Sequence, residues 1–130
     1  MSKLLKFEGH NYLRQRLILA TLSGKVVRID KIRSDDHDPG IRDHEANFLR
    51  LLEKVTNGST IEINYTGTSV LYKPGAIQGG RIEHDCGTDR SISYYLEPMI
   101  ALAPFSKKPF MLILRGITTD HVDNSVSVSQ

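Results

Sequence analysis

The chain of 130 residues and 14.6 kDa has the size of one domain, long enough to bury roughly two-thirds of its unfolded surface. Its hydrophobic share of 39%, charged share of 25% and formal net charge of +2 exclude a disordered chain and a histone-like polycation. The single cysteine, Cys86, excludes an internal disulfide and is typical of a reducing compartment. No apolar stretch approaches the ~20 residues of a spanning helix, so we expect a soluble, intracellular protein without membrane contact.

The first part of the chain shows an alternation of strand and helix patterns. β-branched residues indicate strands, whereas apolar residues at three- and four-residue spacing indicate helices. A polar run with a Pro-Gly pair marks the longest connection as a loop. In chain order the sequence predicts a strand over 4–7, a helix between Asn11 as N-cap and Gly24 as C-cap, a strand over 26–32, a loop over 33–40 and a helix from about 42 to 57.

The segments that follow complete one unit and begin another. Predicted strands over 59–65 and 69–73 flank a short turn and form a hairpin. The order strand, helix, strand then returns after Gly79-Gly80, over 81–85, about 91–102 and 110–115. We therefore expect an α+β fold with one complete unit over 1–77 (strand-helix-strand-helix-strand-strand, two helices packed on a four-stranded sheet), part of a second unit over 78–118 and a disordered tail over 119–130.

Four arginines near the predicted helix starts are candidates for binding phosphate or RNA. Arg14 and Arg16 belong to the first helix, Arg33 follows a strand, and Arg42 begins the second helix. Guanidinium groups and the unpaired N–H groups of a helix N-terminus both bind phosphate well. The alternative is that the arginines form surface ion pairs with neighbouring acids, namely Glu8, Asp35 and Asp43.

Acidic and histidine residues in and after the polar loop form a second set of candidates. Asp35 and Asp36, with His37 and Asp38, carry donor atoms that suit a divalent ion, but calcium-loop spacing is missing. The alternative is a solvated turn that stabilises the next helix. We assign no metal and no cofactor, and keep Asp35, Asp36 and His44 as candidates for acid–base or metal chemistry.

Two further pairs of reactive residues favour structural roles. His44 and Glu45 are adjacent on a helix and point about 100° apart, which predicts a helix-surface pair instead of a converging acid–base pair. His84 and Cys86 share one face of a predicted strand without a third group to orient them. We therefore predict that Cys86 is a small buried residue.

Long runs of the sequence match the motifs of one family. They include NYLRQRLILATLSGK over 11–25, DPGIRDHE over 38–45, EHDC over 83–86 and YYLEP over 94–98. With these runs the chain resembles, over about residues 7–124, the RNA 3′-terminal phosphate cyclase superfamily and specifically its eukaryotic, nucleolar cyclase-like branch. The resemblance implies repeated four-stranded sheets, each backed by two helices, in proteins nearly three times as long.

The resemblance also implies that cyclase activity is missing. Cyclases of the family have several glycines and a glutamine where this chain has Gly9-His10-Asn11-Tyr12, and a second basic residue where it has Ser34-Asp35-Asp36. Carboxylates beside a triphosphate add repulsion. The histidine that cyclases adenylylate, near the end of their chains, has no counterpart here, so we assign no catalytic residue.

By the same resemblance, we expect a nuclear, nucleolar factor of ribosome biogenesis. It would bind a ribosome-assembly GTPase, pre-ribosomal RNA and small-subunit processome proteins, and would support 18S pre-rRNA processing and small-subunit assembly. The alternative that the resemblance leaves open is an endoribonuclease that cleaves pre-rRNA.

Overall fold

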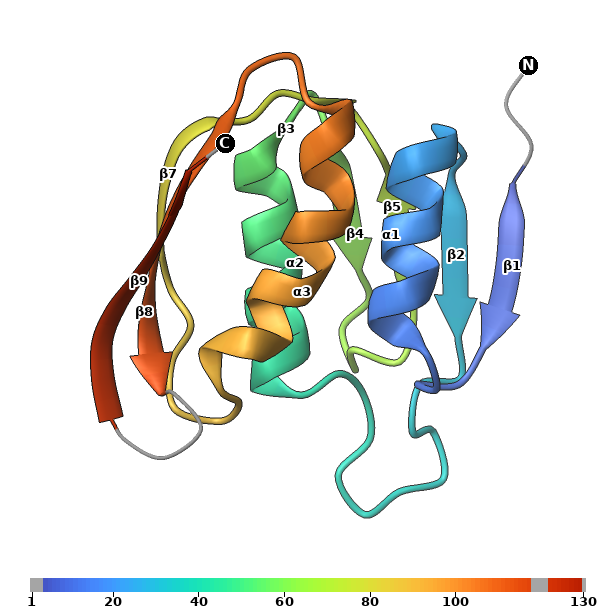
Figure 1. Cartoon of the computed structure of the whole chain (residues 1–130). Helices are drawn as coiled ribbons and strands as arrows, with labels where there is room; N and C mark the ends of the chain where they lie inside the picture. The colour runs from blue at the N-terminus through green and yellow to red at the C-terminus, as the bar shows by residue number, and fades with distance from the viewer. Residues whose placement is uncertain (1–3, 118–121, 130) are drawn as a thin grey trace.

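The computed structural model describes residues 4–117 and 122–129, which contain three α-helices and three β-sheets (Figure 1). The elements of the first unit are β1 (Leu5–Glu8), α1 (Leu13–Ser23), β2 (Val27–Asp30), α2 (Asp43–Val55), β4 (Thr60–Ile63) and β5 (Val70–Lys73). Its sheet has the order β1-β2-β5-β4, in which β1 and β2 are parallel and the other pairs antiparallel. The predicted α+β unit is confirmed.

The second part repeats the opening of the first. Its elements are β7 (Gly80–Asp85), α3 (Ile92–Leu102), the 3₁₀ helix η1 (Ala103–Phe105), β8 (Phe110–Ile117) and β9 (Val122–Ser129). β7 and β8 are parallel neighbours joined through α3, as β1 and β2 are joined through α1. Two short strands, β3 (Thr56–Asn57) and β6 (Ala76–Ile77), pair with each other between these parts.

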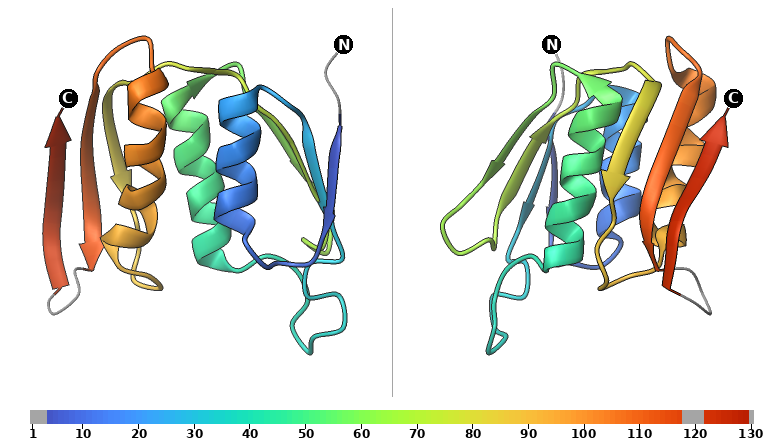
Figure 2. Two further views of the ribbon diagram at one scale, coloured as in Figure 1. Left: turned by 45° about the vertical axis from the view of Figure 1, so that its right-hand side comes forward. Right: turned by 90° about the vertical axis from the view of Figure 1, so that its left-hand side faces the viewer.

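The helices lie between the four-stranded and the three-stranded sheet, and one apolar core joins all of them (Figure 2). Its largest fully buried side chains include Tyr72, Tyr95, Phe48, Phe110, Leu17, Ile29 and Met99. A polar contact also links the two parts, because Arg14 donates a 2.8 Å hydrogen bond to the carbonyl oxygen of Tyr94. No helix in the described residues combines the length and apolar character needed to cross a membrane.

Several predicted boundaries differ from the observed ones. The N-cap of α1 is Tyr12, in a left-handed conformation with φ 59°, and not Asn11, whereas the predicted C-cap Gly24 is confirmed. β2 stops at Asp30 because Lys31 and Arg33 also have positive φ values. α2 ends at Val55, before the predicted residue 57, because the backbone becomes extended and enters β3.

The C-terminal segment also departs from expectation. The sequence predicted a disordered tail over 119–130, whereas residues 122–129 form β9, antiparallel to β8. Alternating Val and Ser over 125–129 has the two-residue period of a strand, and the adjacent strand supplies the hydrogen-bonding edge that such a segment needs. The remaining tail positions, 119–121 and 130, lie outside the described residues.

Candidate functional site

The three helices begin at the same end of the molecule, the lower end in Figure 1. Parallel strands joined by a helix bring their carboxyl ends and the next helix N-termini to one side. The connections 9–12, 31–42 and 86–91 therefore meet at this end, and they contain most of the candidate residues from the sequence.

Arg33 is bound within the loop between β2 and α2. Its Nη1 and Nη2 atoms lie 2.6 Å and 3.0 Å from the two carboxylate oxygens of Glu45, and only 13% of its side chain is exposed. Glu45 also accepts a 2.7 Å hydrogen bond from the backbone N–H of Arg42. Burial opposes ionisation of Glu45, but the hydrogen bonds from Arg33 and Arg42 outweigh it and lower its pKa below 4.5.

Arg42 is occupied by the same loop. Its guanidinium donates to the backbone carbonyl of Asp38 at 2.6 Å and to the carboxylate of Asp36 at 3.1 Å. A carboxylate oxygen of Asp38 lies 3.2 Å away. The loop thus holds both of its arginines with its own acceptors and with Glu45.

The arginines of α1 also have intramolecular partners. Arg14 donates to the carbonyl of Tyr94 and stacks on its ring, with 4.1 Å between guanidinium carbon and ring centroid. Arg16 lies 4.6 Å over the ring of Phe7 and donates to the backbone carbonyls of Glu8, at the end of β1, and of Gly9. Arg14, Arg33 and Arg42 form ion pairs, as the alternative interpretation of the sequence predicted. Their partners differ from the predicted acids and are Glu45, Asp36, Asp38 and Glu97. Binding of phosphate or RNA by these arginines stays a prediction.

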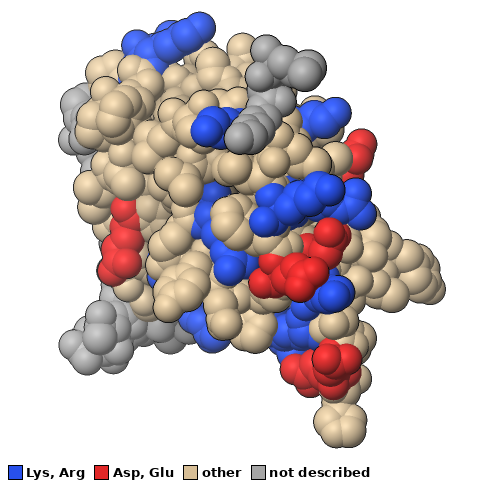
Figure 3. All heavy atoms as spheres, turned by 90° about the vertical axis from the view of Figure 1, so that its right-hand side faces the viewer, with Lys and Arg blue, Asp and Glu red and all other residues tan. Residues whose placement is uncertain are grey.

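Charges of both signs alternate on the side of the molecule that carries β1 and β2 (Figure 3). Arg28 pairs with Asp30 at 3.0 Å, and Lys31 lies 3.4 Å from Glu8. Such paired charges give little net field, so the described residues on this side form no continuous basic patch of the kind that usually marks nucleic-acid binding.

The acid–base candidates are divided between two pockets. Asp35 and Asp36 line a loop pocket of about 580 Å³ together with Gly9, His10 and Lys31. His44 does not line it. Within the described residues, no group of three or more His, Cys, Asp or Glu side chains is arranged to hold a metal ion.

The predicted exposure of His44 and Glu45 is wrong. Their exposed fractions are 8% and 3%, because α2 is covered on one side by the β2–α2 loop and on another by the second unit. The sequence pattern of one helix contains no sign of either contact. Burial, followed by the nearby charge of Arg90, lowers the pKa of His44 below 6.5, so its ring is neutral near pH 7.

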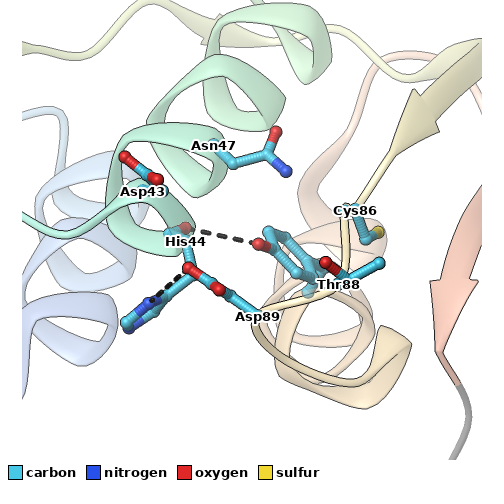
Figure 4. A pocket seen from close by; sticks show the side chains of 8 residues that line it. Asp43, His44, Asn47, Cys86, Thr88 and Asp89 are labelled. Carbon is cyan, nitrogen blue, oxygen red and sulfur yellow. Dashed lines mark hydrogen bonds and ion pairs between the residues drawn. The ribbon is translucent and has the colours of Figure 1, made fainter.

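His44 contributes to a pocket of about 220 Å³ between the two units, here called the junction pocket (Figure 4). It is lined by Asp43, His44 and Asn47 of α2, by Cys86, Gly87, Thr88 and Asp89 of the β7–α3 loop, and by Tyr95 of α3. The Tyr95 hydroxyl donates to the carbonyl of His44 at 3.4 Å, and Asn47 donates to the carbonyl of Asp85 at 3.0 Å. These two bonds join α2 to α3 and to the end of β7, the two elements that flank the β7–α3 loop.

Cys86 is not activated for nucleophilic chemistry. Its exposed fraction is 1%, which confirms the predicted burial, and burial raises the pKa of its thiol to about 12. His84, which shares its strand face, is also buried, and burial followed by the charge of Lys54 lowers its pKa to about 4. A neutral thiol beside a weakly basic imidazole does not form a nucleophile–base pair.

The comparisons with known proteins agree with this architecture. Residues 5–130 match the family described as RNA 3′-terminal phosphate cyclase. The chain belongs to this family. The α+β arrangement of the described residues is therefore that of a partial domain of the cyclase type.

Relatives within the cyclase family carry cyclase-like or processing names. The chain is 59% identical to the RNA 3′-terminal phosphate cyclase-like protein of Bos taurus and 58% identical to that of Homo sapiens, over 95% of this chain. It is 52% identical to the rRNA processing protein RCL1 of Saccharomyces cerevisiae, also over 95% of the chain. The chain spans about a third of the length of these relatives, 33%, 33% and 34%.

Among the residues of the junction pocket that sequence reasoning missed are Asn47, Asp89 and Tyr95. Each has an ordinary local context, an amide on a helix, an acid in a loop and an aromatic in an apolar helix. Their proximity arises only from the packing of the β7–α3 loop against α2, for which the sequence has no local signal.

Proposed function

We propose that this chain acts in rRNA processing, as part of a ribosome-biogenesis factor without RNA cyclase activity. The observation that carries the proposal is its identity of 52% with a yeast protein named for rRNA processing. Support comes from the loop after β2, where two arginines are neutralised by Glu45, Asp36 and Asp38 and so offer little charge to a triphosphate.

A chimera tests the proposal directly. In yeast depleted of its own RCL1, a version whose N-terminal segment is replaced by residues 4–130 of this chain should restore growth and the normal ratio of mature 18S rRNA to precursor. The matched control is the same protein reassembled with its own segment. Failure of a chimera that accumulates to the control level would overturn the proposal.

The finer proposal is that the factor works in the nucleolus on 18S pre-rRNA, and binds pre-ribosomal RNA, a ribosome-assembly GTPase and other small-subunit processome proteins. If Arg14, Arg16, Arg33 or Arg42 contact RNA phosphates, the affinity for a pre-18S fragment must fall with salt, with a logarithmic slope near 0.7 to 0.9 per phosphate contact. An affinity that does not change with salt would restrict the proposal to protein docking.

The alternative proposal is an endoribonuclease that uses Asp35, Asp36 or His44. It is less favoured because Asp36 is paired with Arg42 and because His44 lines a different pocket. Incubation of the purified chain with precursor RNA tests it. Cleavage no faster than that of the Asp35→Ala/Asp36→Ala variant and of a His44→Ala variant would end it.

A further inference from the structure

We propose that the junction pocket binds the guanidinium group of an arginine side chain presented by a protein partner. This inference goes beyond the proposed function and does not depend on it. It rests on the polar groups that line the pocket, on the lack of a partner for His44, and on the size of the pocket (Figure 4).

The charged groups of the junction pocket are hydrogen-bond acceptors. The acidic residues that line it are Asp43, in the first turn of α2, and Asp89, in the β7–α3 loop. Ionised carboxylates accept hydrogen bonds and cannot donate them. A ligand that satisfies both must carry several N–H groups, and a positive charge strengthens each bond.

His44 is a buried polar side chain without a hydrogen bond to the described residues. Its side chain is 9% exposed, and its Nδ1 lies 3.9 Å from Asp89, beyond hydrogen-bonding distance. The ring packs edge-on against Tyr94, with 5.3 Å between centroids, which fixes its position. The neutral ring offers one acceptor nitrogen to a ligand beside the carboxylate of Asp89.

The size of the pocket selects a side chain over a nucleotide. Its volume of about 220 Å³ is below the roughly 300–1,000 Å³ of most small-molecule sites. A guanidinium is planar and carries five N–H donors in a fixed arrangement, so it can bond to acceptors on two sides at once. Arginine is also among the residues that contribute most to protein interfaces.

The cations of the chain near the pocket are engaged elsewhere or lie at its rim. Arg42 is held by Asp36 and Asp38. Arg90 is exposed and donates to the backbone carbonyl of Asp89 at 3.0 Å, leaving that carboxylate for a ligand. Because the lining comes from both units, an arginine bound here would contact α2 and the β7–α3 loop together.

The test is an NMR titration of the full chain with N-acetyl-arginine amide, and with N-acetyl-citrulline amide as the neutral isostere. The arginine probe should shift the backbone amide signals of Asn47, Gly87 and Asp89, and the citrulline probe should bind at least about tenfold more weakly, since hydrogen bonds between charged groups are the stronger ones. Binding should weaken with added salt.

Matched variants make the result specific. Asp43→Asn/Asp89→Asn should weaken arginine binding about tenfold or more, whereas Glu53→Gln/Glu62→Gln, the same charge change on exposed residues away from the pocket, should leave it within twofold. Equal binding of citrulline, no shift at the pocket, equal effects of the two double variants, or stronger shifts with a nucleoside monophosphate would each overturn the proposal.

Discussion

The two loops that lead into α2 and α3 differ in whether their charged side chains form ion pairs. The β2–α2 loop, residues 31–42, is rich in charge, and its arginines are bound by Glu45, Asp36 and Asp38. The β7–α3 loop, residues 86–91, has a single acid, Asp89, whose carboxylate forms no ion pair with a Lys or Arg of the described residues and lies 3.9 Å from the neutral ring of His44. The loop with many charged residues is therefore held together by its own ion pairs. The loop with few charged residues keeps its carboxylate free of such pairs and available to a ligand.

Replacing Glu45 tests the first half of this comparison and should have the largest effect. Glu45→Gln removes the carboxylate that binds Arg33 and leaves a guanidinium with 13% exposure without a counter-charge. Breaking a buried ion pair in this way should lower the free energy of unfolding by about 3–5 kcal/mol. Urea unfolding followed by circular dichroism measures the change.

The control for that measurement is Asp89→Asn in the other loop. Asp89 is 55% exposed and makes no short ion pair, so the substitution should change stability by less than about 0.5 kcal/mol. Equal losses for the two variants would show that the loops do not differ in the way described.

Local patterns in the sequence were sufficient for much of the fold. Gly24 was predicted as a C-cap because glycine accepts the left-handed conformation, and its φ is 70°. The parallel pair of β1 and β2 follows from a strand–helix–strand order. These features depend on neighbours in the chain, which a sequence pattern contains.

Features that depend on distant contacts could not be predicted in this way. The burial of Glu45 requires Arg33 to fold back across the loop, and the junction pocket requires Asp89 to lie beside His44. The short pairing of Thr56–Asn57 with Ala76–Ile77 replaced the last two predicted residues of the helix, because those residues find a partner strand about twenty positions later. Tertiary packing decided each of these cases.

A pair of glycine substitutions sharpens the comparison of the two loops. Gly40 has φ 98°, and a Cβ there would overlap the carbonyl oxygen of Thr66 in the β4–β5 turn. Gly40→Ala should therefore cost about 3 kcal/mol, from backbone strain plus displacement of that turn. Gly87→Ala, with φ 70° and no atom nearer than 3.8 Å, should cost about 1 kcal/mol. Thermal unfolding of both variants provides the measurement, and a larger loss for Gly87→Ala would contradict the difference in packing.

Acid titration should distinguish the contribution of His84, in the second unit, to stability from that of Glu45, which holds the β2–α2 loop. Burial, followed by the charge of Lys54, lowers the pKa of His84 from 6.5 to about 4. Between these two pH values the unfolded chain therefore binds a proton that the folded chain does not bind. Stability is then full above pH 6.5 and falls by up to about 3 kcal/mol as the pH drops toward 4. The lowered pKa of Glu45 stabilises the folded chain above pH 4.5, and this contribution is lost only as the pH falls below that value.

His84→Gln isolates the first of these pH windows. Between pH 6.5 and 4.5 the variant should lose less stability than the unsubstituted chain, and the remaining loss should come from His44, whose pKa is also lowered. Urea midpoints at half-unit pH steps provide the comparison. An unchanged slope in the variant would mean that another group, and not His84, binds the proton on unfolding.

The smallest expected effect comes from Arg42, and it tests whether the exposed part of the β2–α2 loop is held by charge or by geometry. Arg42 is 28% exposed, and its partners Asp36 and Asp38 are 44% and 91% exposed, so water and salt screen both pairs. Arg42→Ala should cost about 0.5–1 kcal/mol at low salt, and less at 0.5 M salt. A loss above about 2 kcal/mol that does not change with salt would instead assign the effect to its 2.6 Å hydrogen bond with the backbone carbonyl of Asp38. In that case Arg42 would fix the loop backbone as Glu45 does, and the loop would be rigid to its tip.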